Sequence, residues 1–305
     1  MISKRAQANL ALGFCALIWG ATFVVIKDAL ADVSVVTYLA VRFVLAAALM
    51  AAIYWRSMRN LTWHTVSAGV QIGVFMFGGY AFQVAGLKFT TPSKAAFITG
   101  SCVVMVPILL GVFGRRRITV WVWAGALAAF AGLYFLTVPP AGLGALNRGD
   151  PLVLVCALMF ALQIIFIGRY VARHSVAALS FLQVATTAVL SLLLLPVAWA
   201  AGWERPRLLL TDYLIFAILL TAIGATVIGF SLQTWAQQYA PPSHAALLLT
   251  LEPVFAAITS FVVGQEHLGA RALVGAALIL AGILFAEWRA PAVTESPAPS
   301  ISPAE

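Results

Sequence analysis

The 305-residue chain is 63% hydrophobic and only 9% charged, and its mean hydropathy is +1.01. A soluble domain is about half apolar and a quarter charged, so this composition excludes a soluble protein and predicts an integral membrane protein. The net charge of +8 does not indicate nucleic-acid binding, because the basic residues lie in short segments between apolar stretches, where they orient membrane helices. We therefore expect a lipid bilayer around the chain and no nucleic acid as a partner.

Apolar stretches of about 20 residues, the length that a helix needs to cross the hydrocarbon core, recur along the chain. The first follows Lys4 and Arg5 like a signal peptide, but its length and the lack of a small-residue cleavage site indicate an uncleaved helix. Residues 290–305 form a Pro/Ala/Ser-rich tail that is predicted to be disordered. The predicted membrane helices are Ala8–Ile26, Val33–Tyr54, Ser67–Ala85, Ser93–Phe113, Val120–Val138, Leu152–Gly168, Ala177–Ala201, Tyr213–Trp235, Ser243–Val263 and Ala272–Trp288.

Lysine and arginine gather on one predicted side of the membrane. With the N-terminus inside, the inside-facing segments carry most of the Lys and Arg, and the outside-facing segments carry most of the Asp and Glu. This positive-inside bias predicts that both termini are cytoplasmic. We expect the protein in a bacterial inner (plasma) membrane.

The chain also contains an internal repeat. Residues 92–135 align without a gap on residues 242–285, with a shared start Pro-Ser-x-Ala-Ala and a shared pair of spaced glycines. Five helices per half is an odd number, so the second half enters the membrane in the opposite orientation. The basic loop Arg115-Arg116-Arg117 accordingly corresponds to the non-basic loop Gln265-Glu266-His267. The sequence predicts an all-α membrane protein of two inverted five-helix repeats, residues 1–140 and 141–289.

Short motifs follow one another in a fixed order over residues 8–288. They are Trp19-Gly20, the run Tyr38–Ala47, the run Gly86–Phe97, Leu251–Phe255 and Gly264–Glu266. In this order and spacing they resemble the drug/metabolite transporter superfamily, and within it the EamA-type exporters of ten helices. Members of that family often carry an acid in both repeats where this chain has Glu266, but its first half has Arg116 there.

Arg42 lies about nine residues into its predicted helix, which is roughly 13 Å deep at 1.5 Å per residue. A charge this close to the bilayer midplane is costly and usually faces the interior of the bundle with a partner. One interpretation is a contact to an anionic group such as a substrate carboxylate. The other is a structural anchor that binds helix-end carbonyls or an acid of the other half.

Glu252 lies at a similar depth in the ninth predicted helix and precedes Pro253, which removes a backbone hydrogen bond and frees a carbonyl group. Pro107 has a comparable place in the fourth predicted helix. Because burial disfavours the charged form of a carboxyl group, Glu252 is a candidate for coupling transport to protons. A glutamate that only holds helices together is the alternative.

The resemblance implies a central cavity surrounded by the first, third, fourth, sixth, eighth and ninth helices. Mostly apolar walls with a few hydrogen-bonding groups are typical of a small-molecule site, although each glutamine alone also fits an interhelical hydrogen bond. Lys94 and His244 correspond in the repeat, and they fit either gate contacts or solvated interface positions. The residues expected to bind substrate are Trp19, Arg42, Tyr80, Gln83, Ser101, Phe160, Gln163 and Gln233.

These features predict a secondary transporter and not an enzyme. The sequence has no GxxxxGK[ST], GxSxG or HExxH motif and no cluster of acids for a metal, so we expect no cofactor and no metal. The resemblance implies export of a small metabolite by alternating access; Arg42 and the aromatic residues favour an amino acid. Open alternatives are an uncoupled facilitative carrier, a drug or nucleoside exporter, a channel and, more remotely, a membrane receptor or an intramembrane enzyme. Ten helices enclose a cavity within one chain, so we expect a functional monomer.

Overall fold

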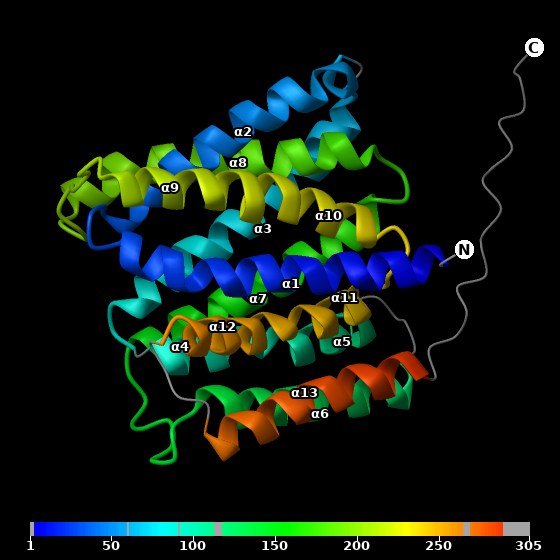
Figure 1. Ribbon diagram of the computed structural model, residues 1–305. Helices are drawn as coiled ribbons and strands as arrows, with labels where there is room; N and C mark the ends of the chain where they lie inside the picture. Colours follow the sequence, from blue (N-terminus) through cyan, green and yellow to red (C-terminus); the bar gives the residue numbers. More distant parts are fainter. Residues whose placement is uncertain (1–2, 60, 91, 113–117, 265–268, 289–305) are drawn as a thin grey trace, which may run out of the picture.

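The computed structural model describes residues 3–59, 61–90, 92–112, 118–264 and 269–288, and the regular elements of this part of the chain are all helices (Figure 1). An isolated antiparallel bridge joins Val33 and Leu208, which lie in two different connections between helices. The elements are α1 (Lys4–Ala29), α2 (Val35–Met58), α3 (Trp63–Leu87), α4 (Pro92–Gly100), α5 (Cys102–Val112), α6 (Val120–Thr137), α7 (Gly149–Tyr170), α8 (Val176–Ala200), α9 (Asp212–Leu220), the π-helix η1 (Thr221–Ile228), α10 (Gly229–Ala236), α11 (Pro242–Leu249), α12 (Leu251–Val262) and α13 (Ala270–Trp288).

Within the described ranges, nine helical segments are long and apolar enough to cross a membrane, and the shorter apolar helix Ala270–Ala286 in α13 adds a tenth. The predicted ten-helix, all-α membrane architecture is therefore confirmed. Three of the predicted spans are not single helices: the fourth is α4 followed by α5, the eighth is α9, η1 and α10, and the ninth is α11 followed by α12. The tail 290–305 and the loops 115–117 and 265–267, which carried part of the orientation argument, lie outside the described residues.

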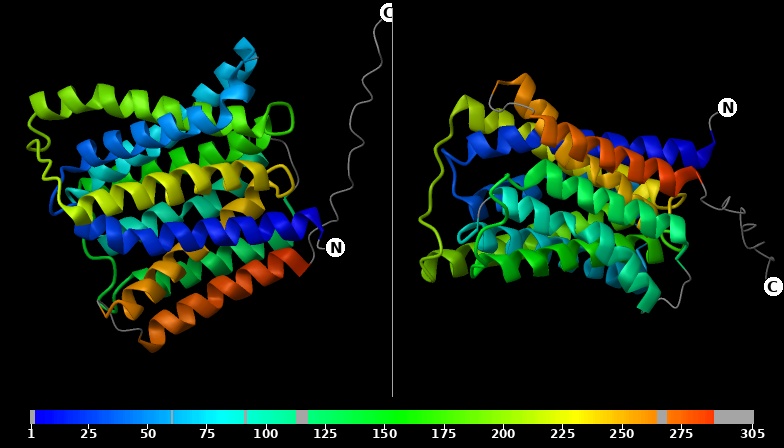
Figure 2. Two further views of the ribbon diagram at one scale, coloured as in Figure 1. Left: turned by 45° about the horizontal axis from the view of Figure 1, so that its top comes forward. Right: turned by 90° about the horizontal axis from the view of Figure 1, so that it is seen from below.

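The helices lie side by side, and Figures 1 and 2 show this from three directions. Helices α6 and α13 pack together at one side of the bundle, and α2 packs on α8 at the opposite side (Figure 1). Between these pairs, α1 packs on α12 and α10, while α7 packs on α5 and α3. Helices α6 and α13, and likewise α2 and α8, are equivalent helices of the two halves that pack on each other. The equivalent helices α1 and α7 each pack on the broken span of the other half, α12 and α5 respectively.

The contact between α6 and α13 shows the symmetry of the two halves at atomic detail. A methyl group added to Gly125 would lie 2.5 Å from the carbonyl oxygen of Gly282, and one added to Gly282 would lie 2.5 Å from the carbonyl oxygen of Gly125. Gly132 and Gly275 are related in the same way, at 2.5 and 2.6 Å. Glycine is required at these four positions because the two backbones cross in direct contact, as in other helix pairs with small residues at the interface.

The fourth and ninth spans are interrupted at nearly equivalent positions of the repeat, Ser101 and Thr250. At each break the hydroxyl group donates to the carbonyl oxygen three residues earlier, Ser101 to Ile98 and Thr250 to Leu247, both at 2.6 Å. Helix α5 continues through Pro107, so the interruption in the fourth span lies more than one turn before that proline. Discontinuous spans at corresponding places of two repeats mark the binding region of many secondary transporters.

Candidate functional site

Arg42 on α2 is the centre of the candidate site. Its side chain is only 4% exposed, and its Nε donates a hydrogen bond of 2.8 Å to the hydroxyl oxygen of Thr226 in η1. The guanidinium carbon lies 5.4 Å from the ring centroid of Phe43 and 5.9 Å from that of Tyr80. A buried guanidinium next to aromatic rings gains cation–π attraction, which offsets part of its desolvation.

Aromatic side chains from five spans surround this position. The ring of Tyr80 on α3 contacts Phe43 at 5.2 Å and, edge to face, Phe160 on α7 at 5.4 Å between centroids. Trp19 on α1 contacts Phe230 on α10 at 5.2 Å, and its indole N–H donates to the carbonyl oxygen of Ala225 in η1 at 2.7 Å. Both clusters of rings have defined orientations, so they form rigid apolar walls.

Glu252 brings an acidic group from the second half to the same region. It is the second residue of α12, directly after the break at Thr250, and its side chain is half-buried. The Arg42 guanidinium acts electrostatically on the Glu252 carboxyl group, and both act on Tyr80. Among the described residues, however, Arg42 and Glu252 do not form a direct ion pair. The two side chains therefore belong to the same region but are not bonded to each other.

We refer to Trp19, Arg42, Tyr80, Phe160 and Glu252 as the charged cluster. Its members come from α1, α2, α3, α7 and α12, which the chain brings together from both repeats. All five were predicted as site residues from the sequence, and the structure places them in one region. Two further predicted residues lie next to it: Gln83 is half-buried one turn after Tyr80, and Ser101 is half-buried at the break between α4 and α5.

The π-helix η1 is the part of the site that sequence reasoning missed. It contributes the Thr226 hydroxyl that holds Arg42 and the Ala225 carbonyl that holds Trp19. π-Helical turns inside α-helices occur frequently at functional sites. A sequence signal does relate two other site residues. The tripeptide Cys-Ala-Leu occurs at residues 15–17 of α1 and at residues 156–158 of α7, and this alignment makes Trp19 and Phe160 equivalent residues of the two repeats.

Gln163 and Gln233, two of the predicted substrate-binding residues, take part in a separate network. Gln163 Nε2 donates to Gln183 Oε1 at 3.1 Å and to Gln233 Oε1 at 3.3 Å, and Gln183 Nε2 donates to the Thr234 hydroxyl at 3.0 Å. All four side chains are at most 2% exposed. We call these four residues the glutamine network; it joins α7, α8 and α10 by hydrogen bonds inside the bundle.

The predicted gate residues, Lys94 and His244, occupy equivalent third positions of α4 and α11. Lys94 forms a buried ion pair with Asp150 at 2.6 Å and also donates to the carbonyl oxygen of Ala145 at 2.9 Å. Asp150 also accepts a hydrogen bond from Thr90 at 2.8 Å. Lys94 thus ties the start of α4 to the segment between the two halves. His244 is 5% exposed within α11, which packs on α1, α5 and α7.

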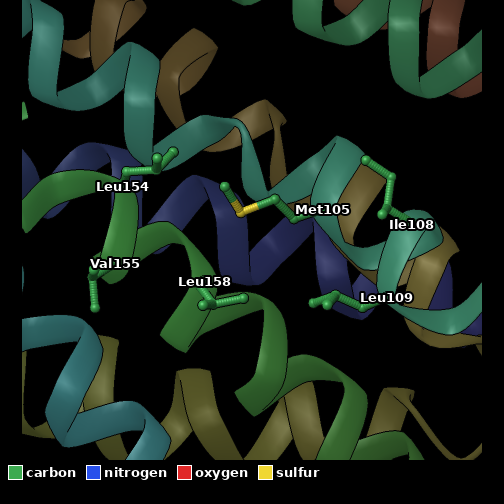
Figure 3. A pocket seen from close by; sticks show the side chains of 6 residues that line it. All are labelled: Met105, Ile108, Leu109, Leu154, Val155 and Leu158. Carbon is green, nitrogen blue, oxygen red and sulfur yellow. The ribbon is translucent and has the colours of Figure 1, made fainter. Parts of the chain in front are cut away.

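Pro107 is buried inside α5, whereas Pro253 lies in the first turn of α12, where its missing N–H has no helical partner to lose. A cavity of about 250 Å³ opens between α5 and α7 (Figure 3). Its lining is wholly apolar and contains none of the predicted site residues, so we do not assign substrate binding to it. The residues that line it are Met105, Ile108, Leu109, Leu154, Val155 and Leu158.

The residues that the structure describes contain no group of three His, Cys, Asp or Glu side chains that could hold a metal. In the part of the chain that the structure describes, ten apolar helical segments in two halves, with broken spans and intramembrane charges, define a polytopic membrane transporter. The chain matches the EamA-like transporter family over residues 7–138 and again over residues 147–288. It belongs to that family, within the drug/metabolite transporter superfamily.

Relatives of known sequence and structure agree with this assignment. An uncharacterized transporter of Archaeoglobus fulgidus is 35% identical over 291 residues, which cover 94% of this chain and 87% of that protein. A second uncharacterized transporter of the same organism is 25% identical over 92% of this chain and 96% of its own length. A solved structure described only as the crystal structure of a protein has a TM-score of 0.79 at 20% identity and covers 93% of this chain and 97% of that chain, which shows the shared fold.

Proposed function

We propose that this transporter exports a small zwitterionic metabolite, with an amino acid that carries an apolar or aromatic side chain as the best-fitting class. The observation that carries the proposal is the arrangement of Arg42 and Glu252: Arg42 lies against the ring of Tyr80, Glu252 abuts Gly20 next to Trp19, and the two side chains form no ion pair among the described residues. A substrate carboxylate fits the guanidinium, because arginine binds carboxylates through its planar fork. A substrate ammonium group fits Glu252, and the rings of Trp19, Tyr80 and Phe160 fit an apolar side chain.

Alternating access between the two halves is the proposed mechanism. It is supported by the unequal burial of the equivalent half-helices: α11 is buried from Pro242 to Leu248, whereas α4 is half-buried from Ala96 to Gly100. An inverted repeat has two mirrored arrangements of this kind, and rocking one half against the other exchanges them. The Lys94–Asp150 ion pair and His244, at the starts of α4 and α11, are the gate contacts that this exchange would break and form.

We further propose that Glu252 couples export to protons. A carboxyl group that exchanges a proton for a substrate ammonium group carries either ligand but not both, which gives antiport. Because the two ligands of an antiporter move in opposite directions, protons enter the cell as the substrate leaves. Both termini are proposed to lie in the cytoplasm. An uncoupled facilitative carrier and a drug or nucleoside exporter are the competing functions, and the transporter is proposed to work as a monomer.

Counterflow in proteoliposomes tests these proposals. Full-length protein is reconstituted with an unlabelled amino acid inside, and uptake of the labelled amino acid is followed with and without an imposed pH gradient. We expect saturable counterflow that is inhibited by other apolar amino acids but weakly by their amides or by the corresponding amines, which lack one of the two charges. Equal inhibition by nucleosides or by cationic drugs, or flux without saturation, would contradict the proposal.

Arg42→Ala and Arg56→Ala form a matched pair of variants for this assay. Both arginines are on α2, but Arg56 is exposed and stacks on Trp55 near the end of the helix. The proposal requires loss of counterflow in Arg42→Ala and unchanged counterflow in Arg56→Ala. If Arg42→Ala transports as well as the wild type, Arg42 is a structural anchor and the assigned site is wrong.

A further inference from the structure

The face of α2 that carries Arg42 docks on the π-helix η1 at two points. Tyr38 and Arg42 are four residues apart, so they lie one above the other on that face. The Tyr38 hydroxyl bonds to the Thr221 hydroxyl at 2.7 Å, and Arg42 Nε bonds to the Thr226 hydroxyl at 2.8 Å. All four side chains are buried. The two hydroxyl groups on η1 therefore match two side chains that are one α-helical turn apart.

Only a π-helical turn presents these two threonines to one neighbour. In an α-helix, residues five apart point about 140° away from each other, because each residue turns the chain by about 100°. In a π-helix the bond from residue i+5 to residue i stacks such residues on one face. The Thr226 hydroxyl accordingly donates to the carbonyl oxygen of Thr221 at 3.0 Å. The widened turn is thus a condition for holding Tyr38 and Arg42 together.

The direction of these hydrogen bonds follows from the donor count. A threonine hydroxyl has one hydrogen to donate. Thr226 donates it to the Thr221 carbonyl, so its oxygen accepts from Arg42 Nε. The guanidinium has five N–H donors in a fixed plane, and fixing Nε leaves the four on the two terminal nitrogens in a defined direction. The terminal pair is the part of the fork that binds a carboxylate in two parallel hydrogen bonds.

We propose that Thr226 is a positioning residue for substrate specificity: the π-helical turn Thr221–Ile228 fixes the Arg42 guanidinium so that its terminal nitrogens select a carboxylate. The same turn fixes Trp19 through the carbonyl oxygen of Ala225, so one element orients both the charged and the aromatic part of the charged cluster. This inference rests on the proposed function, in which Arg42 binds the substrate carboxylate. It adds the element that determines which ligand geometry Arg42 accepts.

The test uses Thr226→Val, which keeps the shape of the side chain and removes the hydroxyl, and Thr226→Ser, which keeps the hydroxyl. The matched control is Thr187→Val on α8, where a buried threonine donates to the carbonyl oxygens of Gly73 and Gln183 but is outside the charged cluster. We expect Thr226→Val to raise the KM for a transported amino acid about tenfold with the maximal rate within about twofold, since a hydrogen bond to a charged group is lost. Thr226→Ser restores the wild-type KM, and Thr187→Val keeps it.

Selectivity is the readout that a merely structural threonine would not change. The ratio of the KM of the amino acid amide to that of the amino acid is expected to fall in Thr226→Val and not in Thr187→Val, because a loose guanidinium no longer prefers two parallel acceptor oxygens. An unchanged ratio in a correctly folded Thr226→Val, checked by gel filtration, would overturn the specificity role. An equal fall of this KM ratio in Thr226→Ser, which keeps the hydroxyl group, would also overturn the specificity role.

A second measurement does not need transport. Phenylglyoxal modifies arginine, and mass spectrometry reports the rate at Arg42 separately from that at Arg169. We expect Thr226→Val to raise the rate at Arg42 at least threefold and to leave Arg169 unchanged, because the guanidinium gains freedom. An unchanged rate at Arg42 would overturn the positioning role. If the wild type carries no amino acid, the proposed function fails, and this labelling still decides whether Thr226 holds Arg42.

Discussion

The charged cluster and the glutamine network both bond to the eighth membrane span, through η1 and through α10, yet they differ in how their polar groups are satisfied. In the glutamine network, the side chains bond to one another across α7, α8 and α10. In the charged cluster, Arg42 is held through Nε, and Glu252 has no direct ion pair within the described part of the chain. A network whose members satisfy one another holds helices together, whereas polar groups left with free capacity are suited to a ligand.

The largest expected effect is on transport by Arg42 variants. Arg42→Lys keeps the positive charge but loses the planar fork and the bond from Nε to Thr226. Truncating one partner of a buried charged contact costs about 2–5 kcal/mol, so we expect Arg42→Ala to lower substrate affinity by about a hundredfold or more, with Arg42→Lys in between. Substrate-induced quenching of tryptophan fluorescence measures the affinity. Equal affinity in Arg42→Lys and wild type would show that the fork is not used.

Lys94→Met tests whether the Lys94–Asp150 ion pair stabilises the fold, as the hydrogen bonds of the glutamine network are expected to do. The variant leaves Asp150 buried beside Thr90 without its cation, and breaking a buried ion pair from one side costs about 3–5 kcal/mol of stability. We expect a clearly lower unfolding temperature in detergent, and partial recovery in the double variant Lys94→Met/Asp150→Leu. Equal stability of Lys94→Met and wild type would show that the pair does not hold α4 to α7.

Gln233→Leu breaks the glutamine network at one member. It leaves Gln163 without one partner in the interior, which costs about 1–3 kcal/mol. We expect a lower unfolding temperature and a KM close to that of the wild type, with the exposed Gln71→Leu on α3 as a control for glutamine loss. A large rise in KM at unchanged stability would instead make Gln233 a substrate-binding residue, as the sequence first suggested.

The smallest effect is expected on the driving force, from Glu252→Gln. In a one-to-one antiporter, a gradient of one pH unit supplies about 1.4 kcal/mol, which is about tenfold accumulation of substrate. The variant is expected to keep saturable counterflow without a gradient, at a higher KM because the substrate ammonium group loses its carboxylate partner, and to lose the tenfold response to an imposed one. Proteoliposomes with a step in external pH measure both. A Glu252→Gln variant that still responds to the gradient would exclude Glu252 as the coupling site.

The sequence by itself determined the class of fold, and all five members of the charged cluster were predicted from it. The apolar runs and the repeat are local patterns with a direct physical reading, because a membrane helix has to be apolar over its whole length and an odd number of helices inverts the second half. An arginine in the middle of an apolar run is costly, so Arg42 was recognisable without a structure. The spaced glycines of α6 and α13 were recognisable as well, although their partner was not.

The tertiary structure decided which polar groups satisfy one another. Counting residues from the start of a span gives the depth of a residue, but a span that is apolar all round has no period that shows which way a side chain faces. Gln163 and Gln233 therefore looked like Gln83 in the sequence. Only the packing of α7, α8 and α10 joins them to each other. The π-helix is a second case: no local propensity distinguishes Thr221–Ile228 from an α-helix, and the side chains that bond to its two threonines, Tyr38 and Arg42, come from another helix. Side chains distant in the sequence thus decided the site, because hydrogen bonds in an apolar interior have no water to replace them.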